Sequence, residues 1–294
     1  MKEPDLRLRA VVPAPPKVTW EALTDPAAMR VWLAEHADVD LPGKYEFWGR
    51  FTPDGAAPRQ RVLHVDEHTI RFGWTVEGVE DTVQFEVADD KDGTLVTLSH
   101  SDLPSFEDII ADRAGARGAV QTFWSLAIAN LADYLAGREL TPKVDFTSPE
   151  LRASLVIDAA PEQVFDSITR AEVFRKWFGA VVDIEPRLGG RFAMGGFELD
   201  PGGAKFVEFE PGRKAALLFA DGETTSWELA GSEGRTRLTV THSGFDPANP
   251  PYSAWGGWLG GLAGLRRYHE LPGQRPIWRQ VEIAGVPVGL LADD

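Results

Sequence analysis

Two histidines carry most of the chemistry that this sequence offers. One ends the run Thr94-Leu-Val-Thr-Leu-Ser-His100, and the other ends the run Thr236-Arg-Leu-Thr-Val-Thr-His242. Counting back by twos from each histidine meets apolar residues, so each imidazole is expected on the inward face of a β-strand, at the strand's end. There it can act as a general acid or base near neutral pH. The alternative, which recurrence in both runs favours, is a structural histidine that hydrogen-bonds a neighbouring loop and caps its strand.

The other residue types that support catalysis or metal binding give no comparable candidate. The 294-residue chain has no cysteine, and its six histidines show no metal-binding spacing, so we expect neither thiol chemistry nor a metal site. The stretch Gly256–Gly261 superficially resembles a phosphate loop, but it falls inside an expected helix. We therefore predict no cofactor.

An internal repeat accounts for the two histidines. Leu6–Leu33 aligns without a gap on Leu151–Phe178 at an offset of 145 residues, the histidine runs align at an offset of 142, and Trp124 falls on Trp258 at an offset of 134. Matching blocks in the same order indicate a duplicated domain. We predict a first domain over residues 1–140, a linker over 141–149, and a second domain over 150–294 that includes an apolar tail without a counterpart in the first half.

Both halves predict the same order of elements. A strand (6–12 or 151–157) runs into a proline at a helix start, two short helices follow, strands broken by turn signals come next, and a long helix (120–135 or 252–268) closes the half. This order predicts an α+β fold: two tandem domains, each a curved antiparallel sheet wrapped round a long carboxy-terminal helix, with two short helices after the first strand.

The order of elements resembles that of the SRPBCC superfamily, the START or Bet v 1-like helix-grip group. The resemblance rests on Trp20-Glu-Ala-Leu-Thr-Asp-Pro26 with Trp32, on the strand end Thr-His242-Ser-Gly-Phe245, and on the tryptophan-rich final helix. It covers about residues 5–140 and 150–270 and is nearest the bacterial domains related to the activator of Hsp90 ATPase. Members bind lipids, hormones or polyketides, catalyse cyclisations, or assist chaperones.

The resemblance implies that an apolar small molecule, aromatic or polycyclic, binds between sheet and final helix. Most of the ten tryptophans are expected in the core, and a subset is expected to line the cavity. The predicted ligand-binding residues are Trp258, Trp227, Phe219, Gly257, Gly261, Leu262, Tyr268, Trp124, Phe85 and Trp74.

The final helix of the second half is diluted by glycine. At the offset of 134 residues, Gly257 stands in the place of Phe123, and Gly260 stands in the place of Leu126. Either the second domain has the roomier cavity, or another backbone packs there: the first domain, the second subunit of a homodimer, or the carboxy-terminal tail.

The sequence leaves open whether the molecule is transformed. An enzyme of this kind would, by the resemblance, be a cofactor-independent cyclase, aromatase or dehydratase in which His242 or His100 moves a proton. We prefer His242, because the final helix of its domain makes room. The alternatives are a non-catalytic carrier and a chaperone-associated, Hsp90-activator-like interaction module.

The overall charge bears on partners. A formal charge of −15 argues against nucleic acid and anionic membranes as partners. The amino terminus lacks the apolar core of a signal peptide, and no stretch approaches the roughly 20 apolar residues that span a bilayer. We expect a cytoplasmic protein.

Overall fold

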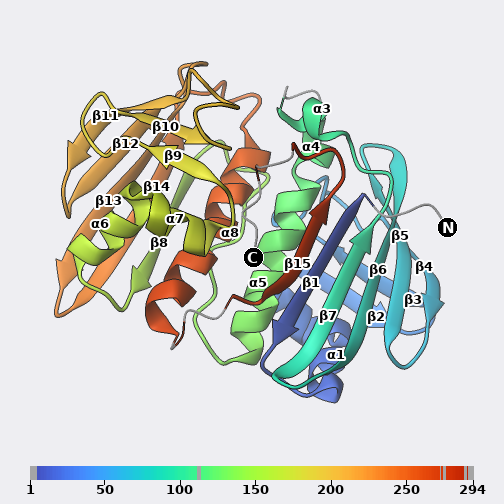
Figure 1. Cartoon of the computed structure of the whole chain (residues 1–294). Coiled ribbons are helices and arrows are strands. Elements are labelled where there is room, and N and C mark those ends of the chain that lie inside the picture. The colour runs from blue at the N-terminus through green and yellow to red at the C-terminus, as the bar shows by residue number, and fades with distance from the viewer. Residues whose placement is uncertain (1–4, 111–113, 272, 274–275, 288–289, 291–294) are drawn as a thin grey trace. The chain divides into compact units, whose positions relative to one another are not determined.

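The computed structural model describes residues 5–110, 114–271, 273, 276–287 and 290 (Figure 1). Its contacts divide the chain into two compact units. The first unit is the chain up to Thr147 together with Tyr252–Gly260 and Ile277–Gly285, and the second is Ser148–Pro251, Gly261–Pro276 and the residues after Gly285. The change of unit at Thr147 falls within the stretch 141–149, where the sequence predicts a linker.

The first unit is built on an antiparallel sheet with the strand order β15-β1-β7-β6-β5-β4, and β2 pairs separately with β3. Buried and half-buried side chains alternate along β1, as expected for a strand with one face in the core. Its strands are β1 (Leu6–Val12), β2 (His36–Asp40), β3 (Lys44–Trp48), β4 (Gln60–Val65), β5 (Thr69–Val76), β6 (Val79–Asp90), β7 (Gly93–His100) and β15 (Trp278–Ile283). Its helices are α1 (Pro16–Thr24), α2 (Pro26–Trp32), α3 (Phe106–Ile110), α4 (Gly115–Gly118) and α5 (Val120–Leu135).

Local sequence signals explain where the short helices begin. Pro16 and Pro26 occupy the first turns of α1 and α2, where a missing backbone N–H removes no helical hydrogen bond. The side chain of Asp25 caps α2 by accepting hydrogen bonds from the backbone N–H groups of Ala27 and Ala28, at 3.0 and 3.3 Å.

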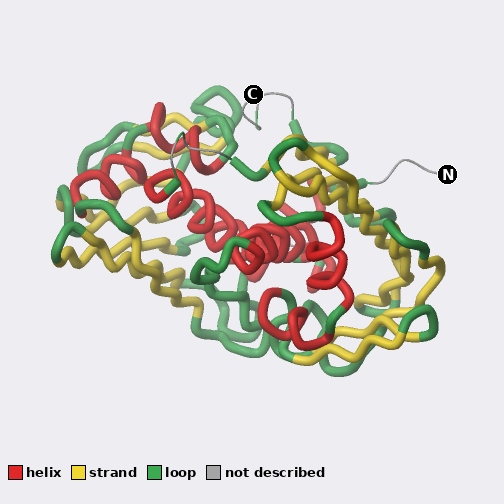
Figure 2. The backbone as a smooth tube through the Cα atoms, turned by 90° about the horizontal axis from the view of Figure 1, so that it is seen from below, coloured by secondary structure: helices red, strands yellow, loops and turns green. Residues whose placement is uncertain are grey.

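The second unit repeats this plan with the strand order β8-β14-β13-β12-β11-β10-β9. Figure 2 shows the strands of each unit as a yellow layer beside its red helices. The strands are β8 (Leu151–Ile157), β9 (Val182–Ile184), β10 (Arg191–Met194), β11 (Ala204–Glu210), β12 (Lys214–Leu218), β13 (Thr224–Ser232) and β14 (Arg235–Ser243). The helices are α6 (Pro161–Thr169), α7 (Ala171–Phe178) and α8 (Tyr252–Glu270), and α8 begins in the first unit and ends in the second.

The predicted fold class is confirmed. Each half has antiparallel strands, two short helices directly after its first strand, and a long helix after its last sheet strand. The long helices differ little from their expected bounds: α5 covers Val120–Leu135, and α8 runs two residues beyond Tyr268.

The carboxy-terminal tail forms a strand of the first unit. β15 pairs antiparallel with β1, with Leu6 opposite Ile283 and Leu8 opposite Val281. The sequence-based division assigned all of 150–294 to the second domain, and the contacts of Ile277–Gly285 differ from that division. The physical reason is the open edge of β1, whose backbone N–H and C=O groups gain partners from β15.

Candidate functional site

The two predicted histidines end equivalent strands and point into the protein. His100 is the last residue of β7 and His242 lies one residue before the end of β14. His100 is 0% exposed and His242 is 4% exposed. Their ring nitrogens contact other side chains, and among the described residues neither ring makes the hydrogen bond to a loop backbone that the structural alternative invoked.

In the first domain, His100 belongs to a buried polar chain. Its Nδ1 accepts a hydrogen bond from the indole N–H of Trp124 at 3.0 Å. Its Nε2 lies 3.5 Å from Oδ2 of Asp81, and neither side chain is exposed. The guanidinium of Arg117 donates to Oδ1 of the same carboxylate at 2.8 Å. Contacts therefore link an indole, an imidazole, a carboxylate and a guanidinium, and the 3.5 Å step between the imidazole and the carboxylate is longer than a hydrogen bond.

The indole partner fixes the protonation state of His100. An indole N–H can only donate, so Nδ1 of His100 has to remain an acceptor and the ring proton has to sit on Nε2, which faces Asp81. A second ring proton would point at the indole N–H. Burial lowers the pKa of His100 below its ordinary value, which also favours the neutral ring. His100 is thus held as a neutral, structural group.

In the second domain, His242 lies between a carboxylate and a hydroxyl. Its Nε2 is 2.7 Å from Oε2 of Glu223, and its Nδ1 is 2.6 Å from Oγ1 of Thr225. Thr225 stands directly opposite His242 in the pairing of β13 with β14, so the sheet register itself brings the hydroxyl to the ring.

The hydroxyl partner leaves both protonation states of His242 open. A threonine hydroxyl donates to a neutral Nδ1 and accepts from a protonated one, so the ring keeps two hydrogen bonds in either state. The other end of the chain reaches solvent, because the side chain of Glu223 is 22% exposed whereas that of His242 is 2% exposed. Glu223 is therefore the member of this pair that a ligand can touch.

Two half-buried phenylalanines border the pair. The ring of Phe245 stacks on His242 with a centroid distance of 5.8 Å and an interplanar angle of 16°, and the ring of Phe219 lies at 6.3 Å. Phe219 was a predicted ligand-binding residue, and Phe245 was not. Together they place apolar aromatic surface beside the imidazole that contacts Glu223.

The two acids were missed by the sequence analysis, although a signal for them exists. The offset of 142 residues that relates His100 to His242 also relates Asp81 to Glu223. The same offset relates Val83 to Thr225, and this difference supplies the hydroxyl in the second domain only. A search for acidic residues at this offset, with Asp and Glu treated as equivalent, would have found both carboxylate–histidine pairs.

The predicted aromatic residues of the first domain lie in a closed core. Trp74, Phe85 and Trp124 are each 1% exposed or less. The ring of Trp124 meets those of Trp74 and Phe85 edge-on, at centroid distances of 5.5 and 5.4 Å. These side chains pack on one another, and their predicted contact with a ligand stays a prediction.

The remaining predicted ligand-binding residues belong to the second half of the sequence. Trp227, Trp258 and Leu262 are buried, at 2%, 7% and 2% exposure, while Tyr268 is half-buried. Trp227 lies on β13 opposite Val240 of β14. Their role in binding likewise stays a prediction.

Two of the helix glycines are explained by close packing inside the second domain. A Cβ on Gly261 would lie 2.6 Å from the ring of Phe178, and one on Gly264 would lie 2.4 Å from the backbone oxygen of Trp177. Both contacts are too short for a side chain, so only glycine lets α7 approach α8 here. At these two positions the packing groups, the Phe178 ring and the Trp177 backbone, belong to the same domain, which the sequence analysis did not consider.

The two glycines that replaced large side chains have more space. A Cβ on Gly257 would have ordinary contact with Thr122 at 3.8 Å. Apart from its chain neighbours and the adjacent backbone of its own helix, no heavy atom of the described residues lies within 4 Å of a Cβ built on Gly260. Packing therefore explains part of the glycine cluster, and space remains at these two positions.

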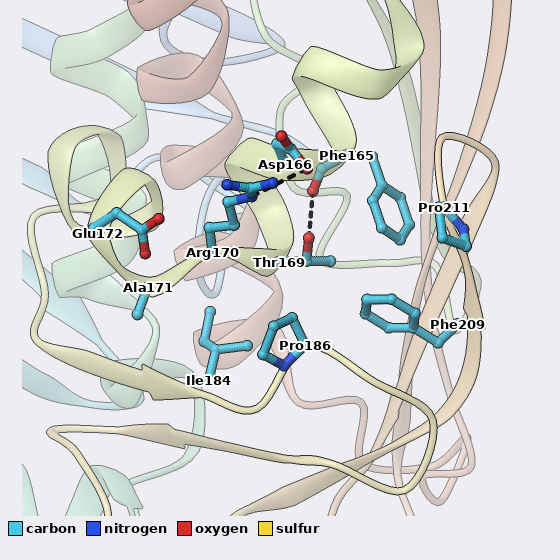
Figure 3. Close-up of a pocket in the computed structure, with 10 residues that line it drawn as sticks. All are labelled: Phe165, Asp166, Thr169, Arg170, Ala171, Glu172, Ile184, Pro186, Phe209 and Pro211. Atoms are coloured by element: carbon cyan, nitrogen blue, oxygen red, sulfur yellow. Dashed lines mark hydrogen bonds and ion pairs between the residues drawn. The ribbon is translucent and has the colours of Figure 1, made fainter.

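A pocket of about 490 Å³ lies at another part of the second domain. Figure 3 shows it between the α6–α7 corner, the residues after β9 and the β11–β12 turn, with Phe165, Phe209 and Pro211 along one wall. None of the predicted ligand-binding residues is among the described residues that line it.

Side-chain clusters and helix lengths bear on metal binding and on membrane insertion. Within the described ranges, no three side chains of His, Cys, Asp or Glu come together as a metal site would require. No helix in the part of the chain that the structure describes combines the length and the apolar character needed to cross a membrane.

The fold and the duplicated pairs define a tandem α+β protein, and comparison with known families identifies its kind. The family model for activator of Hsp90 ATPase homolog 1-like proteins matches residues 13–136 and again residues 158–270. The chain belongs to this family. The double match confirms the predicted resemblance to the Hsp90-activator-related branch of the SRPBCC superfamily and the tandem arrangement of two helix-grip domains.

Several solved structures are similar to this chain. DynU16, a protein in the dynemicin biosynthetic locus, is 18% identical with a TM-score of 0.39, over 90% of this chain and 99% of that chain. CalU16 from Micromonospora echinospora is 22% identical with a TM-score of 0.35, over 48% of this chain and 76% of that chain. The Aha1 dimer from Colwellia psychrerythraea is 19% identical with a TM-score of 0.37, over 42% of this chain and 98% of that chain. No curated protein matches the chain.

Proposed function

We propose that the second domain binds an apolar, aromatic small molecule beside Glu223 and exchanges a proton with it. The observation that carries this proposal is the chain Glu223–His242–Thr225, whose carboxylate end is partly exposed and whose imidazole lies beside Phe219 and Phe245. The phenylalanine rings supply the apolar contact, and the carboxylate supplies a general base or acid within reach of a bound molecule.

Each member of the chain has a separate task. Glu223 touches the ligand and takes up or releases the proton. His242 is a positioning residue: it holds the carboxylate at 2.7 Å and can carry a compensating proton, since its Nδ1 is hydrogen-bonded in both protonation states. Thr225 keeps the ring oriented. This division differs from our prediction that His242 itself meets the substrate, because both ring nitrogens already contact protein side chains.

The proton-transfer step can be tested with 5-nitrobenzisoxazole, an apolar aromatic molecule that reports a general base. The base takes the ring C–H proton, the N–O bond breaks, and a coloured cyanophenolate forms. We expect the protein to accelerate this reaction over an equal concentration of acetate, and we expect Glu223→Gln to remove about 10²-fold of the rate. His242→Gln should lower the rate less and change its pH profile, which a purely structural role would not do.

The duplicated pair offers the matched control. Asp81→Asn makes the equivalent change in the first domain, at a carboxylate that is fully buried. The rate per folded molecule should not change in this variant. Equal loss in Asp81→Asn and Glu223→Gln, or no acceleration by the unaltered protein, would overturn the proposal.

Binding can be tested separately with Nile red, an uncharged polycyclic dye whose emission rises in apolar surroundings. Phe245→Ala should weaken dye binding about tenfold, because it removes the ring that stacks on His242. Phe85→Leu, in the closed core of the first domain, is the control and should leave the affinity unchanged. Unchanged binding in Phe245→Ala would place the apolar contact elsewhere and remove that part of the proposal.

A chaperone-associated interaction module is the second candidate function, and the family match is the observation that favours it. Its test is the ATPase rate of a purified Hsp90 with and without this protein. A stimulation that survives Glu223→Gln would support this candidate over proton transfer.

A further inference from the structure

A second feature of the same domain lies far along the sheet from Glu223. β12 pairs with β13 so that Leu218 stands opposite Thr224 and Lys214 stands opposite Glu228. The β11–β12 turn, which precedes Lys214, is therefore at the opposite end of these strands from Glu223. The pocket of about 490 Å³ is formed at this end, so it is distinct from the proposed proton-transfer site.

One wall of the pocket is apolar and aromatic. Phe165 of α6 and Phe209 of β11 meet edge-on with a centroid distance of 5.2 Å. Pro211 continues this wall in Figure 3, and Ile184 and Pro186 form the floor in that view. The volume falls within the roughly 300–1,000 Å³ that small-molecule sites occupy.

The charged groups of the pocket are two acids and one base. Arg170 lies 3.3 Å from Asp166, so its charge is already matched. Glu172 stands on the opposite side from the aromatic wall in Figure 3, and among the described residues no cationic side chain lies within ion-pair distance of it. The pocket thus combines aromatic faces with one unmatched negative charge, in a chain whose formal charge is −15.

The first domain does not share these features. At the offset of 145 residues, Asp25 occupies the place of Arg170 and Ala27 occupies the place of Glu172. Asp25 is used there as a helix cap for α2. The charge pattern of the pocket is therefore peculiar to the second domain and is not required by the duplicated scaffold.

We propose that this pocket is a second binding site, and that it takes an organic cation: an apolar, ring-containing molecule that carries a protonated amine. The apolar part packs on Phe165, Phe209 and the prolines, and the ammonium group is attracted by Glu172 on the opposite side of the pocket. The Asp166–Arg170 pair leaves no net charge of its own to oppose such a ligand.

Three probes with one ring system and different charges test this assignment. Tryptamine is cationic, indole is neutral and indole-3-acetate is anionic at neutral pH, and their dissociation constants can be compared by calorimetry or ligand-observed NMR on the full chain. Because Glu172 is an exposed side chain, tryptamine should bind about twofold to fivefold more tightly than indole, and indole-3-acetate should bind most weakly.

Variants separate the two contributions. Glu172→Gln should bring tryptamine down to the affinity of indole, and Phe209→Ala should weaken all three probes. Arg170→Met releases Asp166 from its ion pair and should strengthen tryptamine binding. Glu223→Gln, the matched change at the other site, should leave all three affinities unchanged, and Glu172→Gln should leave benzisoxazole turnover unchanged.

The results that overturn the proposal are equally specific. Preference for indole-3-acetate would assign the pocket to an anion, and equal affinities for the three probes would leave Glu172 without a role. Tryptamine binding that is lost in Glu223→Gln but kept in Glu172→Gln would place the amine at the other site.

Discussion

Duplication gave each domain one carboxylate–histidine pair at equivalent positions, and the two pairs differ in the group that contacts the far side of the ring. In the first domain Trp124 donates to His100, while in the second Thr225 shares a hydrogen bond with His242. An indole N–H permits one protonation state, whereas a hydroxyl permits two. The same inherited pair can therefore be structural in one domain and suited to proton transfer in the other.

The two carboxylates also differ in their exposure to solvent. Asp81 is completely buried and is held by Arg117, but the side chain of Glu223 is partly exposed, and its partner His242 lies beside two half-buried phenylalanines. A histidine that recurs in both halves thus gives no evidence, by itself, for chemistry or for scaffolding. The third partner and access to solvent decide which role each copy can have.

The largest expected effect is on stability when the first-domain core is truncated. Trp124→Ala removes a fully buried ring that packs against Trp74 and Phe85 and also leaves His100 without its donor. We expect a loss of about 3–5 kcal/mol in the free energy of unfolding, measured by urea denaturation. Phe245→Ala, at the half-buried ring of the second site, should cost less than about 1 kcal/mol. Equal losses of stability in the two variants would contradict the contrast between a structural site at His100 and an accessible site at Glu223.

The second largest expected effect is a difference in stability between variants of the two acids. Asp81→Asn leaves the buried end of Arg117 without a charged partner, so it should lower the free energy of unfolding by about 2–3 kcal/mol. Glu223→Gln keeps a hydrogen-bonding group at a partly exposed position and should cost less than about 1 kcal/mol. A larger loss of stability in Glu223→Gln than in Asp81→Asn would contradict the structural role that we assign to the Asp81–His100 pair.

The pH dependence of stability gives a smaller but directional effect. Burial lowers the pKa of His100 in the folded protein below the value of about 6.5 that it has when unfolded, so the unfolded chain binds more protons just below that pH. His100 therefore contributes stability that is present above pH 6.5 and is lost as the pH falls below it, at up to about 1.4 kcal/mol per pH unit. Denaturation of the unaltered protein and of His100→Asn between pH 5 and 8 measures this difference. A His100→Asn variant with the same dependence would refute the assignment.

Much of the fold could be predicted because the repeat supplies two readings of each element. The alternation that ends at His100 and His242 placed both rings on the inward face, and the structure agrees. The prolines at residues 16 and 161 marked helix starts correctly, because a proline there removes no helical hydrogen bond. These are local signals, and local signals are what a single sequence contains.

The rest depended on contacts between distant residues. The pairing of β15 with β1 joins residues about 275 positions apart, and strand composition alone does not name a partner. The partners of the histidines depend on strand register and side-chain length. Glu223 could therefore be found only by applying the offset of 142 residues to Asp81 and accepting Glu in place of Asp. The packing of Gly261 on Phe178 likewise joins two helices that no periodicity relates.

The central claim, that the two histidines differ in their capacity to hold a second proton, can be measured directly from the ring ¹⁵N chemical shifts of His100 and His242 as the pH is varied. We predict that His100 keeps the shifts of the neutral tautomer with its proton on Nε2 throughout the range in which the protein is folded. We predict that Glu223→Gln changes the ring shifts of His242, whose Nε2 contacts that carboxylate, while Asp81→Asn leaves them unchanged. A His100 ring that gains a second proton while the protein is folded would contradict the account.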